Sequence, residues 1–370
     1  MKILVTGADG FVGKNLIAQL ANEDFKNVVK FTRHNSVSEL TKLTADVDFV
    51  FHLAGVNRPE TNTEFYEGNT DLTRSLVEAL EHNENYVPIV LSSSIQARLN
   101  NDYGLSKKAA ETIVFNYGEK HDIPVFVYQF KNLFGKWSRP NYNSAIATFA
   151  YNLTHDLPIK INDPDAKLEL SYIDDVITEF IYALKNNTAH REGKYSIVPI
   201  TYSTTVGEIA NKLTAFNNNR QSLIMPSLKN KLDRDLYGTY LSYLDEDNFS
   251  YNLKKNEDNR GWLAEFIKSE DNGQIFISTT KPGITRGNHW HNTKVEKFLV
   301  IQGQGLLQFR KIGTDKVIEY KVSGDTPEPV DIPVGYIHNI KNIGDDTMIT
   351  LFWACEIFDS ENPDTYYEEV

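Results

Sequence analysis

The pattern of apolar segments changes near Tyr243, and this change constrains the fold of the 370-residue chain more than any other feature. Before it, short apolar runs alternate with stretches typical of helices, which indicates βαβ units and a parallel sheet covered by helices on both faces. After it, strand-like runs follow one another across Gly, Asp and Pro turns, as in an antiparallel β-sandwich or barrel. We therefore expect two domains, residues 1–245 and 246–370, with a polar, turn-rich boundary.

Individual elements are predicted from runs rich in β-branched or aromatic residues and from the stretches between them. The strands predicted in the first half are Ile3–Val5, Val28–Phe31, Phe49–Leu53, Ile89–Leu91 and Val125–Phe130. The helices predicted there are Lys14–Leu20, Ser38–Leu43, Leu72–Glu81 and Leu105–Tyr117. The strands predicted in the second half are Gln274–Thr279, Lys297–Gln302, Leu306–Phe309, Lys316–Lys321 and Met348–Phe352. The interval between the second and third runs is short, so we expect one strand of a regular alternation to be missing there.

Charge and cysteine content exclude several classes of protein. The formal net charge of −12, from 38 basic and 50 acidic residues, disfavours nucleic acid or an anionic membrane as the main partner. It leaves a small anionic ligand open, because a few local donors bind a phosphate. A single cysteine, Cys355, excludes a disulfide framework and a cysteine-rich metal site. No apolar run is long enough to span a membrane and no signal peptide precedes the first strand, so we expect a soluble, cytoplasmic protein.

A glycine-rich turn follows the first predicted strand and opens a helix. Gly7, Gly10 and Gly13 permit a tight turn, close approach of the backbone to a pyrophosphate, and close packing of helix on strand. The helix start at Phe11 and Val12 offers unpaired N–H groups and the positive end of a dipole to the phosphates. A purely structural turn could also use three glycines. The position between the first strand and the first helix favours a dinucleotide site.

The end of the second predicted strand should meet the adenosine ribose of such a cofactor. Thr32-Arg33-His34 contains no carboxylate to accept the 2′-hydroxyl of NAD, whereas Arg33 offers a fixed cation to a 2′-phosphate. A solvated surface arginine is the alternative interpretation. We expect NADPH rather than NADH as the cofactor.

Tyr103 and Lys107 stand four residues apart on a predicted helix, which places them on one face. A neighbouring ammonium favours the phenolate, so we expect the pKa of Tyr103 to fall from about 10 towards the working range. Such a pair alone is common on exposed helix faces. Together with the glycine-rich turn and with Ser92-Ser93-Ser94 at a strand end, it indicates acid–base chemistry beside a dinucleotide.

These motifs resemble those of the extended short-chain dehydrogenase/reductase family over about residues 1–245. Further matching motifs are His52-Leu53-Ala54-Gly55, Asn69, Asn132 and Tyr172-Ile173-Asp174-Asp175. The resemblance implies a Rossmann-type doubly wound sheet, nucleotide-sugar substrates and cofactor contacts from Leu53, Ala54 and Gly55. It also implies that Tyr103 donates the proton and that Lys107 binds the ribose and tunes the pKa of Tyr103. Ser94 would hydrogen-bond the substrate oxygen.

Departures from the family pattern narrow the activity. Ile95 and Gln96 replace the Asp–Glu pair of the sugar 4,6-dehydratases, so elimination of water would lack its acid and base. Gln129 replaces an arginine often found three residues before the Asn132 position, which puts a pyrophosphate contact in doubt. Arg33 argues against an epimerase that retains and recycles NAD. A reductase that consumes its cofactor fits best.

The second half carries the spacing of a metal site. Its motifs are Gly283-x5-His289-Trp290-His291-x4-Glu296-x6-Gly303 and Pro333-x4-His338-x3-Asn342. His289 and His291 alternate on a predicted strand, so their imidazoles face one side; Glu296 follows a turn and His338 lies on a later strand. Three imidazoles and one carboxylate suit Zn, Fe, Mn or Ni. A His-x-His pair alone is often incidental, whereas the two full spacings indicate a metal site.

Both spacings resemble those of the cupin family, which implies a metal-binding β-barrel over residues 246–370. Cupins include oxygenases, isomerases, sugar epimerases and storage proteins, and a structural metal without catalysis is an open alternative. The neighbouring reductase favours epimerisation, because a proton beside a ketone is acidic and a metal at the ketone oxygen stabilises the enolate. Reduction would destroy that acidity, so epimerisation has to come first.

As a whole the chain resembles the bifunctional enzymes of capsular polysaccharide synthesis. The resemblance implies C3 epimerisation of a UDP-2-acetamido-2,6-dideoxy-4-keto-hexose, followed by NADPH-dependent reduction at C4, in the supply of UDP-N-acetyl-L-fucosamine. It also implies a homodimer and zinc, although the spacing alone leaves iron and manganese open.

Two alternatives and one role remain open at the level of sequence. The chain could be a reductase whose cupin only dimerises or holds structure, or a sugar-nucleotide sensor that holds NADP without turnover. The residue that moves the C3 proton is not identified. Tyr336 and Lys297 are near the ligands in sequence, and His338 can serve as ligand or as base but not comfortably as both.

Overall fold

The computed structural model describes residues 1–370 and divides them into two compact units. The first unit comprises Met1–Leu213 and Lys231–Leu244, and the second comprises Thr214–Asn230 and Asp245–Val370. The segment Thr214–Asn230 thus groups with the β-rich part of the chain. Two backbone hydrogen bonds attach it there, from Met225 N to Lys268 O (2.7 Å) and from Lys268 N to Leu223 O (2.8 Å).

A seven-stranded sheet forms the centre of the first unit, in the order β2-β1-β3-β4-β5-β9-β8. Its strands are β1 (Ile3–Thr6), β2 (Val28–Phe31), β3 (Phe49–His52), β4 (Ile89–Ser94), β5 (Val125–Phe130), β8 (Arg191–Glu192) and β9 (Tyr195–Ser196). All neighbouring strands are parallel except β8 and β9. Because β2 is the edge strand and β1 pairs directly with β3, the short interval between β2 and β3 adds no strand, as its length predicts.

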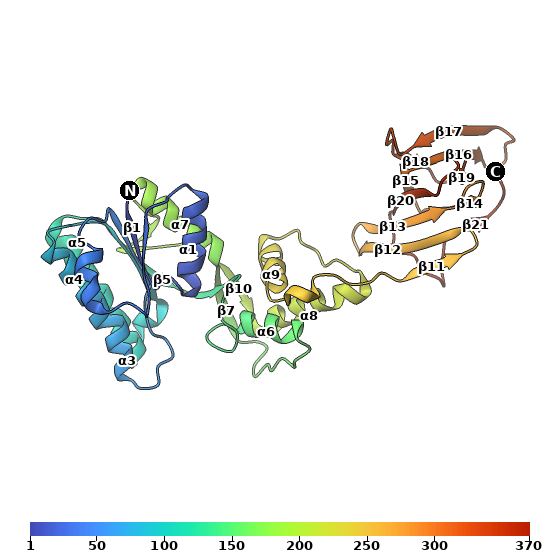
Figure 1. Cartoon of the computed structure of the whole chain (residues 1–370). Coiled ribbons are helices and arrows are strands. Elements are labelled where there is room, and N and C mark those ends of the chain that lie inside the picture. Colours follow the sequence, from blue (N-terminus) through green and yellow to red (C-terminus); the bar gives the residue numbers. More distant parts are fainter. The chain divides into compact units, whose positions relative to one another are not determined.

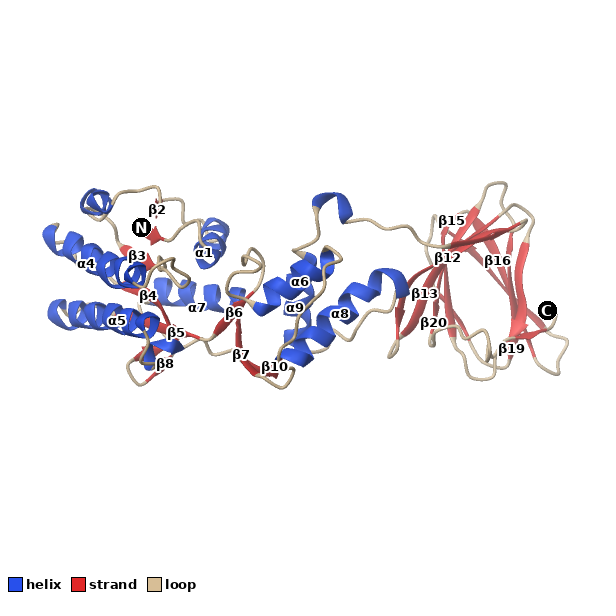
Figure 2. Ribbon diagram, turned by 90° about the horizontal axis from the view of Figure 1, so that it is seen from below, coloured by secondary structure: helices blue, strands red, loops and turns tan.

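Helices cover both faces of this sheet (Figures 1 and 2). One face carries α1 (Phe11–Asn22) and α7 (Ile173–Asn186); the other carries α2 (Leu40–Leu43), α4 (Leu72–His82) and α5 (Asp102–His121). Side chains along β1 alternate between the two faces of the sheet. Ile3 and Val5 belong to the core under α1, whereas Leu4 belongs to the core under α4. The predicted Rossmann-type sheet is confirmed.

The remaining elements of the chain before residue 250 lie outside this sheet and its two helix layers. They include α3 (Thr63–Phe65), the π-helical turn η2 (Tyr66–Asp71), α6 (Ala145–Thr154), α8 (Val206–Ser222), α9 (Lys231–Leu241), and the 3₁₀ turns η1 (Val37–Glu39), η3 (Ile95–Arg98) and η4 (Glu246–Asn248). A second sheet contains β6 (Asn132–Phe134), β7 (Lys167–Tyr172) and β10 (Tyr202–Thr205). No helix in the structure has the length and apolar content needed to cross a membrane.

The second unit is built on two antiparallel sheets. The six-stranded sheet contains β11 (Lys255–Asp258), β12 (Gly261–Ser269), β13 (Gly273–Thr280), β20 (Met348–Ala354), β15 (Glu296–Gln302) and β18 (Val330–Ile332). The five-stranded sheet contains β17 (Val317–Ser323), β16 (Gln304–Lys311), β19 (Tyr336–Asn342), β14 (Thr285–Trp290) and β21 (Tyr366–Tyr367). Phe298 and Phe352 from the first pack in one core with Phe309 and Ile340 from the second. The predicted antiparallel all-β fold is confirmed.

Candidate active sites in the two units

The glycine-rich turn connects β1 to α1 and is packed against the loop that follows β3. Gly7 has a φ of +67°, and a Cβ there would lie 2.7 Å from Ala54 N. Gly10 N donates to Gly7 O (2.9 Å), and a Cβ on Gly13 would lie 2.3 Å from the same oxygen. Because Gly10 has no side chain to cap α1 and the first turn carries no acidic residue, the helix start can receive an anionic ligand.

We expect Gly13→Ala to disturb this turn, since its Cβ would displace the Gly7 carbonyl. The expected result is an affinity for the dinucleotide cofactor lowered about tenfold or more and a free energy of unfolding lowered by about 1–3 kcal/mol. Gly238→Ala in α9 is the matched control, because no heavy atom lies within 4 Å of the position its Cβ would take. That variant should be more stable by about 0.5–1 kcal/mol. Calorimetric titration measures the cofactor affinity, and thermal unfolding measures the stability. Equal effects of Gly13→Ala and Gly238→Ala would contradict the prediction.

A buried polar chain fixes the loop after β3. Thr6 Oγ1 accepts from the N–H groups of Leu53 (3.1 Å) and Ala54 (3.2 Å) and lies 2.7 Å from Nδ1 of His52. His52 Nε2 lies 2.8 Å from the hydroxyl of Thr73. Burial, with a smaller contribution from the charge of Lys107, lowers the pKa of His52 to about 3, so this imidazole is neutral. Neutral His52 holds the loop beside the glycine-rich turn.

Lys107 lies inside the site, one turn along α5 from Tyr103. Its side chain is buried, and Nζ donates to Ser92 O at 3.1 Å. A Cβ on Gly55 would come within 2.8 Å of this Nζ, so the loop after β3 and the lysine meet. Burial lowers the pKa of Lys107 to about 8, against the opposing charge of Glu111.

Tyr103 behaves differently from the expectation drawn from its spacing to Lys107. Burial raises the pKa of the Tyr103 phenol above its ordinary value, and a hydrogen bond with Ser94 opposes that shift only in part. The expected lowering by Lys107 is therefore wrong: burial dominates the pKa of the phenol, and Lys107 is not among the groups that shift it. A phenol that stays protonated is the form that a proton donor needs.

The parallel strands bring these predicted residues to one edge of the sheet. The glycine-rich turn, the loop Leu53–Gly55 and Ser94 follow or end β1, β3 and β4, the carboxyl edge where such sheets bind ligands. Arg33 follows β2 at the same edge and its side chain is exposed. The geometry suits a dinucleotide lying across the strand ends.

Sequence reasoning missed Glu111, a carboxylate that is only 3% exposed and lies one turn beyond Lys107. It accepts hydrogen bonds from Ser93 Oγ (2.5 Å), from Gln129 Nε2 (3.0 Å) and from the hydroxyl of Tyr195 (3.0 Å). The Gln129 amide is thus engaged on both sides, since its Oε1 also accepts from Arg98 Nε at 3.0 Å. The four-residue spacing from Lys107 to Glu111 was the available signal.

The four predicted metal ligands converge in the second unit. The ligand atoms of His289, His291, Glu296 and His338 all lie within 4.8 Å of one another. His289 and His338 oppose each other across β14 and β19, while Glu296 begins β15 of the other sheet. His291 lies just past the end of β14, which contains a register shift between Gly287 and His289. The ring centroids of His289 and His291 nevertheless lie 5.0 Å apart, so the two imidazoles are neighbours as their spacing predicts.

Hydrogen bonds and charge prepare these side chains for a cation. His338 Nδ1 donates to Tyr336 O (3.2 Å), which leaves Nε2 buried with no hydrogen-bond partner. Burial lowers the pKa of His289 to about 4. Burial opposes ionisation of Glu296, but the neighbouring imidazoles of His291 and His338 lower its pKa to about 2. An ionised carboxylate and an orphaned imidazole nitrogen fit a divalent metal.

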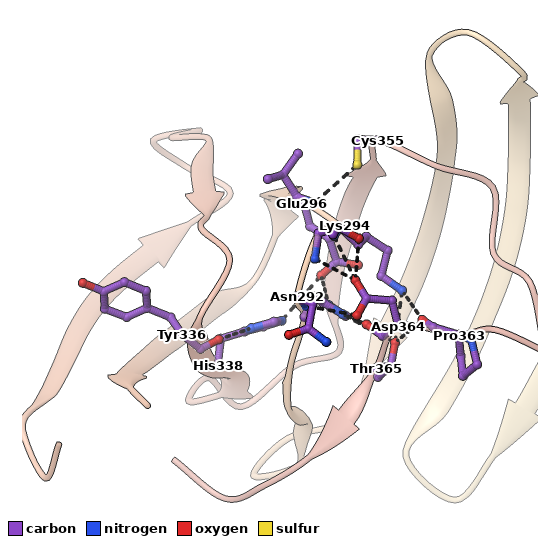
Figure 3. A network of polar contacts seen from close by, with 12 residues as sticks. Asn292, Lys294, Glu296, Tyr336, His338, Cys355, Pro363, Asp364 and Thr365 are labelled. Atoms are coloured by element: carbon purple, nitrogen blue, oxygen red, sulfur yellow. Dashed lines mark hydrogen bonds and ion pairs between the residues drawn. The ribbon is translucent and has the colours of Figure 1, made fainter. Parts of the chain in front are cut away.

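The C-terminal residues lie against this cluster, and sequence reasoning missed them. Figure 3 shows the Asp364 carboxylate facing the turn that carries Asn292 and Lys294. It accepts from the backbone N–H groups of Asn292 (3.0 Å), Thr293 (2.9 Å) and Lys294 (3.0 Å). The carbonyl of Asp364 accepts from His291 Nδ1 at 2.6 Å.

Fold and sites together define an enzyme of the epimerase and reductase type, with a dinucleotide turn and a Tyr–Lys pair in one unit and a His/Glu cluster in the other. The chain belongs to the NAD dependent epimerase/dehydratase family, whose model matches residues 3–198. Residues 256–366 match the polysaccharide biosynthesis C-terminal domain.

Similar proteins span both units. The UDP-2-acetamido-2,6-beta-L-arabino-hexul-4-ose reductase of Pseudomonas aeruginosa is 47% identical over 366 residues, which cover 99% of this chain and 98% of the reductase. The crystal structure of the capsular polysaccharide assembling protein CapF from Staphylococcus aureus matches with a TM-score of 0.94 and 46% identity, over 100% of both chains. A UDP-glucuronic acid 4-epimerase from Bacillus cereus matches 66% of this chain and 99% of its own with a TM-score of 0.55; at 18% identity it shows the fold alone.

Proposed function

We propose that the chain is a bifunctional nucleotide-sugar enzyme of capsular polysaccharide precursor synthesis. Its second unit epimerises C3 of a UDP-2-acetamido-2,6-dideoxy-4-keto-hexose, and its first unit reduces C4 with NADPH. The observation that carries the proposal is the presence of both sites in a chain that matches a named nucleotide-sugar reductase over 99% of its length. Residues 1–245 would be the reductase domain and residues 246–370 a cupin domain.

In the reduction, Tyr103 would donate its proton to the C4 oxygen while Ser94 holds that oxygen. The bound NADPH supplies the hydride to C4. Lys107 would bind the cofactor ribose and place its ammonium beside the reacting groups. Gly7, Gly10 and Gly13, with the N–H groups of Phe11 and Val12, would receive the pyrophosphate.

In the epimerisation, His289, His291, Glu296 and His338 would hold one divalent metal, for which we propose zinc. A metal of this kind acts as a Lewis acid on a carbonyl oxygen. The C3 proton is acidic only while C4 is a ketone, so epimerisation precedes reduction. The residue that moves the C3 proton is not assigned. A homodimer and a cytoplasmic location remain predictions from the resemblance.

Product NMR tests the proposal as a whole. The enzyme is incubated with NADPH and a UDP-4-keto-6-deoxy-2-acetamido sugar in deuterated water. We expect a C4-reduced, C3-inverted product of L-talo configuration that carries deuterium at C3. A reduced product with the original C3 configuration and no deuterium would contradict the proposed epimerisation.

A second function is favoured by the name of the Pseudomonas relative, which states a reductase only. In that case the second unit would hold structure or dimerise, and its metal would take no part in chemistry. Deuterium incorporation at C3 distinguishes the two functions, because a reductase alone does not exchange this proton.

Arg33 should set the cofactor preference through the 2′-phosphate. We expect Arg33→Ala to lower kcat/KM with NADPH by roughly 10- to 100-fold, the effect of one charged hydrogen bond, and to leave kcat/KM with NADH nearly unchanged. His34→Ala, which alters the next exposed residue, is the matched control and should change neither value. Comparable efficiency of the unmodified enzyme with both cofactors would contradict the assignment of NADPH.

A further inference from the structure

The C-terminal residues 363–368 run along the edge of the metal cluster, and we name them the C-terminal strap. We propose that Asp364 is a positioning residue for the cluster and that the strap holds His291 and the turn of residues 292–294 in the geometry that the metal ligands need. This inference rests on the proposed metal site. It assigns a role to a part of the chain that follows His291 by 73 residues.

Asp364 holds His291 through its main chain and the turn through its side chain. Because His291 Nδ1 donates to Asp364 O, Nε2 is the nitrogen that faces the cluster, 3.3 Å from Glu296 Oε2. The Asp364 carboxylate also accepts from Thr293 Oγ1 at 3.0 Å, in addition to three backbone N–H groups of the turn. Asp364 thus holds both His291 and the turn of residues 292–294, which leads from His291 towards Glu296.

The neighbouring contacts lock Asp364 in place. Lys294 is buried, and its ammonium donates to Pro363 O (2.9 Å) and to Thr365 Oγ1 (3.0 Å), on either side of Asp364. Asp364 has a φ of +38°, a backbone conformation that a residue with a Cβ adopts only when its surroundings impose it. Figure 3 shows Lys294, Pro363 and Thr365 gathered around Asp364.

Further along, the strap is attached to the strand that carries His289. Tyr367 pairs with His289 and Tyr366 pairs with Trp290, whose rings stack at 4.7 Å. Glu368 N donates to Asn288 O at 3.1 Å. The strap therefore contacts the chain beside two of the four ligands, as outer hydrogen-bond partners do in metal sites.

Removal of such outer partners typically lowers metal affinity by about 10- to 100-fold. Asp364→Asn keeps the size of the side chain but places an NH₂ group against backbone N–H groups. Lys294→Met keeps the stem of the lysine and removes its two hydrogen bonds to the strap. Asp359→Asn is the matched control: Asp359 lies in the same terminal segment, but its carboxylate accepts only from Glu361 and Asn362.

Competition between each full-length variant and a chromogenic chelator for Zn²⁺ gives the affinities, and the visible spectrum of the Co²⁺ form reports the ligand geometry. We expect a 10- to 100-fold loss of Zn²⁺ affinity and an altered Co²⁺ spectrum for Asp364→Asn, a smaller loss for Lys294→Met, and no change for Asp359→Asn. The rise in Tm on adding Zn²⁺ should shrink in the same order. If Asp364 and Lys294 had a purely structural role, their substitutions would lower Tm by the same amount with and without metal.

Zn²⁺ affinities of Asp364→Asn and Lys294→Met that both stay within twofold of the unmodified chain would overturn the inference. If Asp364→Asn does not fold, the affinity of Lys294→Met decides by the same criterion. Failure of the unmodified chain to bind Zn²⁺ or Co²⁺ would instead overturn the proposed metal site, and the inference with it.

Discussion

Replacement of Tyr103 by Phe is expected to lower the rate of NADPH-dependent reduction by about 10²- to 10⁴-fold, the usual contribution of a positioned proton donor. The substitution removes one oxygen from a largely buried ring and leaves the contact with the Phe65 ring in place. Exchange of the C3 proton with deuterated solvent should continue at the unmodified rate, because it requires the ketone and the second unit only.

Tyr117→Phe is the matched control for that experiment. Tyr117 lies on the same helix, is more deeply buried than Tyr103, and its hydroxyl hydrogen-bonds the backbone of Val87. Its loss should cost about 1 kcal/mol of stability and leave reduction intact. The absorbance of NADPH follows reduction, and NMR follows exchange. Simultaneous loss of exchange and reduction in a folded Tyr103→Phe protein would contradict the proposed division of labour.

Removal of the metal is expected to have the opposite effect to Tyr103→Phe: exchange of the C3 proton should be lost and reduction retained. Chelation, or His338→Ala, should lower the rate of deuterium exchange at C3 by roughly 10³-fold, because the enolate loses its Lewis acid. Reduction of a keto-sugar that already has the inverted C3 configuration should persist. Restoring Zn²⁺ to the chelated enzyme should restore exchange.

His82→Ala, which makes the same chemical change at an exposed position at the end of α4, is the control for that substitution and should alter neither rate. Exchange at the unmodified rate in the metal-free protein would contradict the proposed role of the metal in epimerisation.

The strands and helices around the dinucleotide site could be predicted because their apolar runs are short, dense and separated by clear turns. The five strands predicted in the second half are also present, as β13, β15, β16, β17 and β20. The elements between Phe130 and Gly273 were not predicted. α8 and α9 mix charged and apolar residues along their whole length, and β12 follows the polar segment that the sequence marks as a boundary. The short β14 was recognised only through its histidine spacing.

Among the site residues, the convergence of the His/Glu cluster could be predicted because each member contributes a side chain at a fixed spacing. Asp364 was not, because it contacts His291 through a backbone carbonyl, which any residue type could supply. The position of Tyr103 was predicted correctly, but the direction of its pKa shift was wrong, since the burial of its phenol depends on residues far away in sequence.

The grouping of Thr214–Asn230 with the second unit bears on how such a chain can be divided or recombined. The polypeptide passes from one unit to the other three times, after Leu213, after Asn230 and after Leu244. Cleavage at any single peptide bond therefore leaves at least one unit with a segment missing. Exchange of either unit between related genes, with its exact boundaries kept, would therefore need three coordinated junctions.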